Sequence, residues 1–193
     1  MSNDLRNYEV VLGVSGGIAA YKAPSIASAL VQRGCGVTAV LTRGAIQFIT
    51  PLPFRAITGR KVHTDLFEMP AGSSDPHIQL SGSADLLLIA PATADLIGQM
   101  AAGLAGELLA SLFLSADSPI LLAPAMNDRM WAHPAVQANV AKLAGWSVQM
   151  IGPETGWLAC GTTAVGRMSE PEAIVARAAE ILLATPPRSK QEK

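Results

Sequence analysis

Cys160 lies in the stretch GWLACGTTAVGRM, residues 156–168, of a chain that holds only two cysteines. The glycines and threonines around its thiol predict irregular backbone rather than a regular helix or strand. Two interpretations are open for this stretch. It is either a flap that brings Cys160 over a bound substrate, or a glycine-rich turn that carries an inert cysteine. The choice depends on whether other chemically active residues converge on the same place.

Asn127 and His77 are two further polar candidates: Asn127 follows a predicted buried strand, and His77 lies near a stretch rich in glycine, serine and proline. Asn127, in PAMNDRMW, can both donate and accept hydrogen bonds, as recognition of a carboxylate requires. It is also typical of a helix N-cap with Met126 in the core, and spacing alone slightly favours that cap. His77, in PHIQL, is a candidate base or imidazolium partner near neutral pH, although a single histidine is more often structural.

Gly16 and Gly17 stand between an apolar run and a helical pattern in GVSGGIAA. Backbone N–H groups at such a turn can bind a phosphate with help from the helix dipole, and a plain tight turn is the alternative. The spacing is not GxGxxG, and Thr42 and Arg43 stand where a dinucleotide site has an acidic residue. The pattern therefore disfavours a dinucleotide and favours a mononucleotide such as FMN.

Thr93 supplies a hydroxyl between two alanines in APATAD, residues 90–95. The small neighbours would let a flat ring or a phosphate approach the backbone closely. Thr93 and Asp95 are also candidate helix N-caps, and the two roles can coexist.

These residues follow segments that the apolar pattern predicts to be buried strands. The predicted strands are residues 8–14, 37–42, 84–91, 119–124 and 146–152. The predicted helices are residues 23–31, 94–116, 133–145 and 169–184, the last beginning with a capping box of Ser169 and Glu172. Runs that are apolar throughout suit a parallel sheet covered on both faces.

The alternation of strands and helices predicts a three-layer α/β domain with a doubly wound, mainly parallel sheet, Rossmann-like or flavodoxin-like. We expect a single domain over residues 1–185 and a disordered polar tail over 186–193. Ligands bind such folds at the carboxyl ends of the strands, and the segments described above follow those ends.

The composition excludes several classes of function. The 193 residues are 50% apolar and 15% charged with a net charge of −1, which does not indicate binding to nucleic acid or to a membrane. No apolar run is long enough to span a bilayer, and the N-terminus does not resemble a signal peptide. Two cysteines disfavour a disulfide framework, and no residue cluster predicts a metal site. We expect a cytoplasmic protein.

Five segments together resemble the flavin-dependent cysteine decarboxylases, above all those that act on phosphopantothenoylcysteine in coenzyme A biosynthesis. They are collinear: GVSGGIAAYK, PHIQL, ADLLLIAPATADLIGQMAAGLAGELL, APAMNDRMW and LACGTTAVGRM. The order of PAMN followed by ACG and GRM is the most specific part of the resemblance.

The resemblance implies the cofactor FMN and a set of site residues. FMN would be bound by Gly16, Gly17, Ile18, Thr42, Thr93, Ala94, Asp95 and Leu96. His77 and Cys160 would be catalytic, Cys160 as a proton donor, and Asn127 with Met126 would bind the substrate. The family often has Asn and Thr where this chain has Asp95 and Leu96, which leaves their side-chain contacts to FMN open.

The implied reaction converts 4′-phosphopantothenoyl-L-cysteine to 4′-phosphopantetheine and CO₂. The thiol is oxidised to a thioaldehyde, CO₂ is lost to give an enethiol, and the enethiol is reduced again. The alternatives are an oxidative peptidyl-cysteine decarboxylase, a flavin prenyltransferase, a non-catalytic FMN-binding regulatory subunit and a flavodoxin-like electron carrier, the last of which would not need Cys160. The resemblance further implies a homotrimer or a dodecamer of trimers, and a phosphopantothenate–cysteine ligase as a separate partner.

Overall fold

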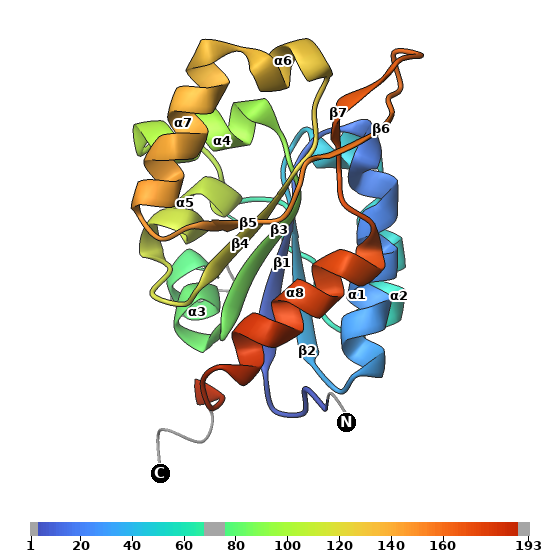
Figure 1. The fold of residues 1–193 in the computed structure, drawn as a ribbon. Coiled ribbons are helices and arrows are strands. Elements are labelled where there is room, and N and C mark those ends of the chain that lie inside the picture. Colours follow the sequence, from blue (N-terminus) through green and yellow to red (C-terminus); the bar gives the residue numbers. More distant parts are fainter. Residues whose placement is uncertain (1–3, 68–75, 189–193) are drawn as a thin grey trace.

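A computed structural model describes residues 4–67 and 76–188, and Figure 1 shows its parallel sheet between two layers of helices. The strands run in the order β2-β1-β3-β4-β5, and all neighbouring pairs are parallel. They are β1 (Glu9–Val14), β2 (Gly36–Leu41), β3 (Leu86–Ala92), β4 (Ile120–Pro124) and β5 (Gln149–Met150). This flavodoxin-like order confirms the predicted fold class and puts a topological switch point between β1 and β3.

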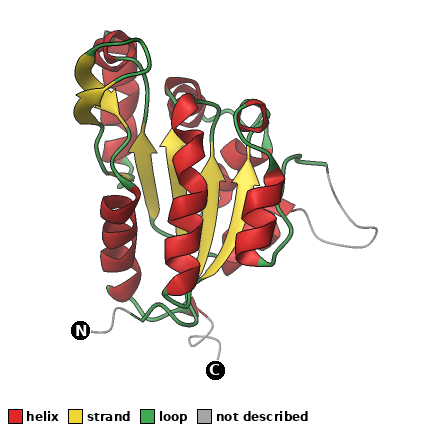
Figure 2. Cartoon of the chain, turned by 90° about the vertical axis from the view of Figure 1, so that its right-hand side faces the viewer, coloured by secondary structure: helices red, strands yellow, loops and turns green. Residues whose placement is uncertain are grey.

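Alternate side chains of each central strand enter two separate cores. Val10 and Leu12 of β1 point into one core, whereas Val11 points into the other. The first core is covered by α1 (Ala23–Gln32), α2 (Pro51–Thr58) and α8 (Pro171–Leu183). The second is covered by α3 (Pro76–Ser83), α4 (Ala94–Ala102), α5 (Leu108–Ser115) and α7 (Pro134–Gly145). The two layers lie on opposite sides of the strands in Figure 2.

Two helices replace the single helix predicted over residues 94–116. The first, α4, ends at Gly103, whose left-handed φ of 69° lets its N–H bond back to the last turn. The next helix, α5, begins only at Leu108. The prediction was wrong because the apolar residues on both sides of Gly103 keep helical spacing, so the pattern does not reveal the glycine C-cap. The loop between the two helices extends to the edge of the sheet where ligands bind.

The last strand of the sheet is much shorter than the predicted 146–152. Trp146 and Ser147 continue the turn that follows α7, where Ser147 has a left-handed φ of 64°. Only Gln149 and Met150 pair with β4. The helices α2 and α3, together with the 3₁₀ turns η1 (Ile18–Lys22) and η2 (Ala45–Gln47) and the short α6 (Asp128–Ala132), were not predicted.

The stretch around Cys160 is a β-hairpin, contrary to the prediction of irregular backbone. Strands β6 (Glu154–Trp157) and β7 (Thr163–Arg167) pair antiparallel as a separate two-stranded sheet. They project beyond the end of the main sheet in Figure 1. Two short strands can satisfy each other's backbone hydrogen bonds even when threonine and glycine weaken the apolar pattern. Cys160 therefore lies at the tip of a defined hairpin.

The predicted capping box at the start of α8 is also wrong. Glu170, not Ser169, occupies the N-cap position, and its side chain makes no capping hydrogen bond. Ser169 is fully buried, and its hydroxyl has no hydrogen-bond partner among the described residues. The Glu170 carboxylate instead pairs with Lys22 and Arg167, which explains why this terminus departs from the usual pattern.

The end of the described chain is held against the domain. Arg188 donates its backbone N–H to Asp85 at 2.8 Å and forms an ion pair with Asp117 at 2.7 Å. The chain thus remains attached up to Arg188, three residues beyond the predicted end of the domain, and 189–193 lie outside the described residues. No helix among the described residues is long and apolar enough to cross a membrane.

Candidate functional site

A pocket of about 1270 Å³ opens at the carboxyl ends of β1 to β4, over the switch point between β1 and β3. Loops after all four strands contribute to it, and the β6–β7 hairpin closes one side. Its volume exceeds the roughly 300–1,000 Å³ of most single-ligand sites. The pocket is therefore larger than a single small ligand needs.

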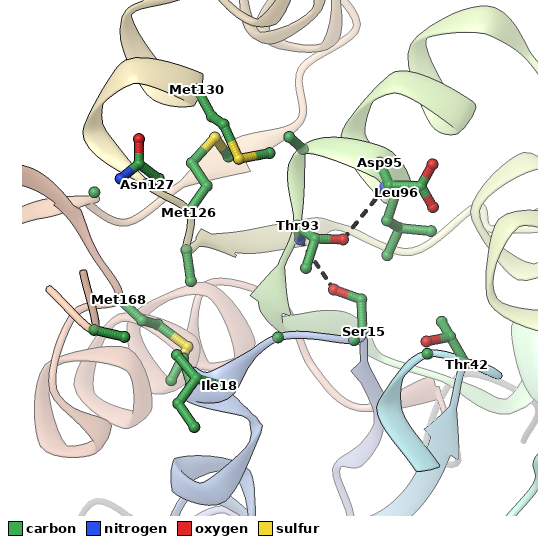
Figure 3. A pocket seen from close by; sticks show the side chains of 18 of the residues that line it. Ser15, Ile18, Thr42, Thr93, Asp95, Leu96, Met126, Asn127, Met130 and Met168 are labelled. Atoms are coloured by element: carbon green, nitrogen blue, oxygen red, sulfur yellow. Dashed lines mark hydrogen bonds between the residues drawn. The ribbon is translucent and has the colours of Figure 1, made fainter. Parts of the chain in front are cut away.

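Every predicted site residue except His77 lines this pocket. These residues are Gly16, Gly17, Ile18, Thr42, Thr93, Ala94, Asp95, Leu96, Met126, Asn127 and Cys160. In Figure 3, Ile18, Met126 and Met168 form an apolar side, while Thr42, Ser15 and Thr93 form a polar side. Such a division suits a ligand with a flat apolar part and a polar tail.

Ser15 ties the two loops at the switch point together. Its Oγ donates to the carbonyl of Pro91 at 2.7 Å and accepts from the N–H of Thr93 at 2.9 Å (Figure 3). The residue is only 1% exposed. We did not predict a role for Ser15 from the sequence. The feature that could have indicated one is its hydroxyl, which directly follows the carboxyl end of the first predicted strand.

Gly16 touches the backbone of Gly44, which follows β2. A Cβ at Gly16 would stand 2.6 Å from the Cα of Gly44, so only glycine allows the two loops to approach. Gly17 has more room, since a Cβ there would meet only the methyl of Thr93 at 3.4 Å. Among the described contacts the N–H groups of Gly16 and Gly17 have no acceptor, which leaves them available to an anion.

Two threonine hydroxyls at the pocket have a proton that no described hydrogen bond uses. The Oγ1 of Thr42 accepts from the N–H of Ala45 at 3.1 Å, and the Oγ1 of Thr93 accepts from the N–H of Leu96 at 3.4 Å. Each hydroxyl can still donate, because a hydroxyl both accepts and donates. The hydroxyls of Thr42 and Thr93 thus add two potential donors to the N–H groups of the first loop.

Asp95 and Leu96 have their polar groups engaged within the protein. Asp95 accepts a hydrogen bond from Gln99 at 2.8 Å, one turn further along α4. Leu96 is 1% exposed and belongs to the second core, and its N–H donates to the hydroxyl of Thr93.

Glu107 lies at the pocket wall, and we did not predict it from the sequence. Burial raises the pKa of its carboxyl.

The structure brings Asn127 and Cys160 into contact across the pocket rim. The Nδ2 of Asn127 donates to the Sγ of Cys160 at 3.3 Å, and its Oδ1 accepts from the N–H of Arg129 at 2.9 Å. Asn127 is therefore the N-cap of α6 and also faces the site. Hydrogen bonds, first from Thr162 and then from Asn127, lower the pKa of the exposed Cys160 thiol.

An ionic network fixes the base of the hairpin. The side chain of Arg167 on β7 passes over Gly156 of the paired strand β6. A Cβ on Gly156 would lie 2.5 Å from the Cδ of Arg167, so the arginine needs a glycine there. It pairs with Glu170, whose other carboxylate oxygen accepts from Lys22 at 2.8 Å. Burial lowers the pKa of Lys22. The carboxylate links the hairpin to the turn that follows the first loop.

His77 lies away from these residues within one copy of the chain. It is the second residue of α3, which packs against α5, and its carbonyl accepts from Ser115 at 3.4 Å. It is not among the residues that line the pocket. Its Nδ1 is buried and has no partner among the described residues.

Comparison with known proteins gives relatives over nearly the whole chain. The family model described as Flavoprotein matches residues 1–183. The coenzyme A biosynthesis bifunctional protein CoaBC of Vibrio parahaemolyticus is 46% identical over 171 residues, which cover 89% of this chain and 43% of that protein. The Bacillus subtilis CoaBC is 44% identical over 171 residues, 89% of this chain and 42% of that protein. The chain thus spans less than half the length of these curated relatives.

Two solved structures share the fold. A PPC decarboxylase mutant in complex with pantothenoylaminoethenethiol has a TM-score of 0.83 and 29% identity, covering 93% of this chain and all of that one. The FMN-dependent cysteine decarboxylase SpaF has a TM-score of 0.81 and 28% identity, covering 93% of this chain and 98% of the other. With its fold, its pocket and a match over residues 1–183, the chain belongs to the Flavoprotein family.

Proposed function

We propose that this chain binds FMN and decarboxylates 4′-phosphopantothenoyl-L-cysteine to 4′-phosphopantetheine and CO₂. The observation that carries the proposal is the contact of 3.3 Å between Asn127 Nδ2 and Cys160 Sγ at the rim of the pocket. This contact brings together the Asn127 amide, a donor suited to a carboxylate, and the Cys160 thiol, which can give up a proton. The names of the curated relatives and of the PPC decarboxylase structure support the same substrate.

The described residues fit FMN. The N–H groups of Gly16 and Gly17 and the hydroxyls of Thr42 and Thr93 would hold its phosphate, because all four are free to donate. The apolar side of the pocket, with Ile18 and its neighbours, would hold the ring. FMN, when bound, would take two electrons from the substrate thiol and return them after CO₂ has left.

Asn127 and Cys160 would divide the remaining work. One N–H of Asn127 Nδ2 bonds to the sulfur of Cys160, and the other is free for the substrate carboxylate. After CO₂ is lost, Cys160 would donate the proton that the carbon needs. The overall reaction consumes one proton and transfers no net electrons, so the cysteine must regain its proton from solvent. Its exposed position allows this.

We further propose that the protein is a homotrimer, or a dodecamer of trimers, in which the partner subunit's His77 completes each site. His77 lies on α3 away from the pocket of its own chain. Ile18 and Tyr21 at the pocket are 61% and 64% exposed, and Ile78 beside His77 is 53% exposed. Two separate apolar patches suit a ring in which unlike surfaces meet. His77 would then assist proton movement or bind the carboxylate.

Mixed oligomers test this arrangement. His77→Asn and Cys160→Ser variants, each unable to form the reduced product alone, would be co-expressed under two different affinity tags. Hybrid trimers purified through both tags should recover about a third of the wild-type sites, and hybrid dodecamers about a quarter, because a shared site can combine the two intact residues. Hybrids without any recovered activity, or a protein that remains monomeric in light scattering, would contradict the shared site.

The substrate experiment separates the proposal from its alternatives. The purified protein should be yellow and should release CO₂ and phosphopantetheine in equal amounts from phosphopantothenoylcysteine. An oxidative peptidyl-cysteine decarboxylase would accumulate enethiol, a prenyltransferase would modify the flavin when given a prenyl phosphate, and a regulatory subunit would bind FMN without turnover. Given this substrate, we place the protein in the cytoplasm with a phosphopantothenate–cysteine ligase acting before it.

A further inference from the structure

Thr162 is a polar residue at the hairpin tip that the function above does not use. Its Oγ1 lies 3.2 Å from the Sγ of Cys160, slightly closer than the Nδ2 of Asn127 at 3.3 Å. The sulfur therefore contacts both a hydroxyl and an amide.

The backbone of the tip fixes this contact. Leu158 donates its N–H to the carbonyl of Thr162 at 2.8 Å, and its own carbonyl accepts from Gly161 at 2.9 Å. Gly161 has a left-handed φ of 84°, which turns the chain back toward Cys160. Leu158 is 7% exposed and anchors the loop. The backbone hydrogen bonds of the loop, and not the side-chain contacts of Thr162, therefore determine its position.

We propose that Thr162 is a positioning residue that stabilises the Cys160 thiolate left after proton transfer and supports its reprotonation. This rests on the proposed function, in which Cys160 gives its proton to carbon. The hydroxyl can accept from the thiol before the transfer and donate to the thiolate after it, by rotation alone. Asn127 Nδ2 can only donate, so it favours the thiolate but cannot hold the thiol proton.

The balance of this step is simple. The S–H bond of Cys160 breaks, a C–H bond forms on the substrate, and the electron pair stays on sulfur. Hydrogen bonds to a charged acceptor are stronger than those to a neutral one, so Thr162 lowers the cost of that charge. Among the described residues, the charged side chains on the elements around the tip are Glu154 of β6, Arg167 of β7, and Asp128 and Arg129 of α6, and none of them bonds to the sulfur in the described contacts.

The reactivity of the thiol tests the inference without substrate. The flavin-loaded protein would be alkylated with iodoacetamide across pH 6 to 10, together with Thr162→Val, Thr162→Ser and Thr163→Val. Cys35 will not interfere, because it is 4% exposed and burial raises its pKa to about 12. Mass spectrometry of the peptide that contains Cys160 gives the rate at each pH.

The expected results differ for each variant. Thr162→Val, which replaces the hydroxyl with a methyl group of similar size, should shift the alkylation midpoint to higher pH and slow alkylation below that midpoint by about tenfold. Thr162→Ser should retain the wild-type midpoint, and Thr163→Val, the neighbouring control, should match the wild type. An unchanged midpoint in Thr162→Val, or an equal shift in Thr163→Val, would overturn the proposal.

A second readout links the residue to turnover. With phosphopantothenoylcysteine, Thr162→Val should form a larger share of the oxidised enethiol than the wild type, while Thr162→Ser restores the wild-type product ratio. A uniform loss of both products with no change in their ratio would contradict the positioning role. Failure of the wild type to turn over this substrate would contradict the proposed function alone, because the alkylation profile is independent of substrate.

Discussion

Gly166 lies directly against the backbone of Met126, with the N–H of Met126 donating to the carbonyl of Gly166 at 3.0 Å. A Cβ at Gly166 would collide with the carbonyl oxygen of Met126. Through this contact β7 joins the loop after β4, so the hairpin tip comes within hydrogen-bond distance of Asn127. The close approach at Gly166 therefore helps to position Cys160 over the pocket.

Gly166→Ala should separate the hairpin from that loop. We expect a loss of about tenfold or more in formation of the reduced product, because the proton donor moves away from the carbon, with FMN still bound. Product analysis and flavin absorbance would be compared with Val165→Ala, a half-exposed neighbour on the same strand. Wild-type turnover in Gly166→Ala would show that the contact does not position Cys160.

Gly16→Ala and Gly17→Ala should behave differently although the residues are adjacent. The methyl group of the first would overlap the backbone of Gly44, whereas that of the second meets a side-chain methyl at an ordinary distance. We therefore expect Gly16→Ala to lower the melting temperature of the flavin-free protein and Gly17→Ala to leave it nearly unchanged. Equal melting temperatures for the two variants would contradict the close approach of the loops.

Arg167→Gln should weaken the base of the hairpin. The variant breaks the ion pair with Glu170 and, among the described residues, leaves Lys22 as the remaining cation on that carboxylate. We expect an increased proportion of oxidised enethiol. Arg177→Gln is the matched control, because Arg177 also forms an (i, i+3) ion pair, with Glu180 on α8 far from the hairpin. The account requires the product ratio to change only in Arg167→Gln.

Asn127→Asp should abolish decarboxylation while FMN remains bound. A carboxylate at this position would repel the substrate carboxylate, and it would also raise the pKa of the adjacent Cys160 thiol. CO₂ release and flavin content would be measured beside Asn139→Asp, a control on α7. A colourless Asn127→Asp protein would mean that Asn127 serves the cofactor or the fold.

Cys160→Ser should separate the two halves of the reaction. Serine is a much weaker acid than cysteine, so in air, where O₂ can reoxidise the reduced flavin, CO₂ release should continue while phosphopantetheine formation falls by about a hundredfold or more. The enethiol would be detected by its absorbance and mass. Full formation of phosphopantetheine by Cys160→Ser would remove the proton-donor role assigned to the cysteine.

Much of the fold, and the position of the candidate site at one edge of the sheet, follow from local patterns in the sequence. Apolar strands alternating with helices determine a parallel sheet, and a parallel sheet brings all its carboxyl-end loops to one edge. For that reason Thr42, Thr93 and Asn127, far apart in the chain, could be expected together, and they line one pocket.

The remaining features depend on contacts that local patterns do not encode. The hydroxyl of Ser15 bonds to the backbone of Pro91 and of Thr93. A side chain is excluded at Gly16 only because the backbone of Gly44 comes close to it. The hairpin escaped prediction because its strands are short and weakly apolar, and their pairing is stabilised at the base by Arg167. The position of His77 depends on the packing of α3, which a short polar segment does not reveal.

The most direct test of the account is the balance of electrons and carbon in one turnover experiment. The yellow protein would be incubated anaerobically with phosphopantothenoylcysteine while CO₂, phosphopantetheine and flavin absorbance are recorded together. The account predicts equal amounts of CO₂ and phosphopantetheine over many turnovers, with the flavin oxidised at the end. The absence of CO₂, or CO₂ release that stops after one turnover with the flavin left reduced, would contradict it.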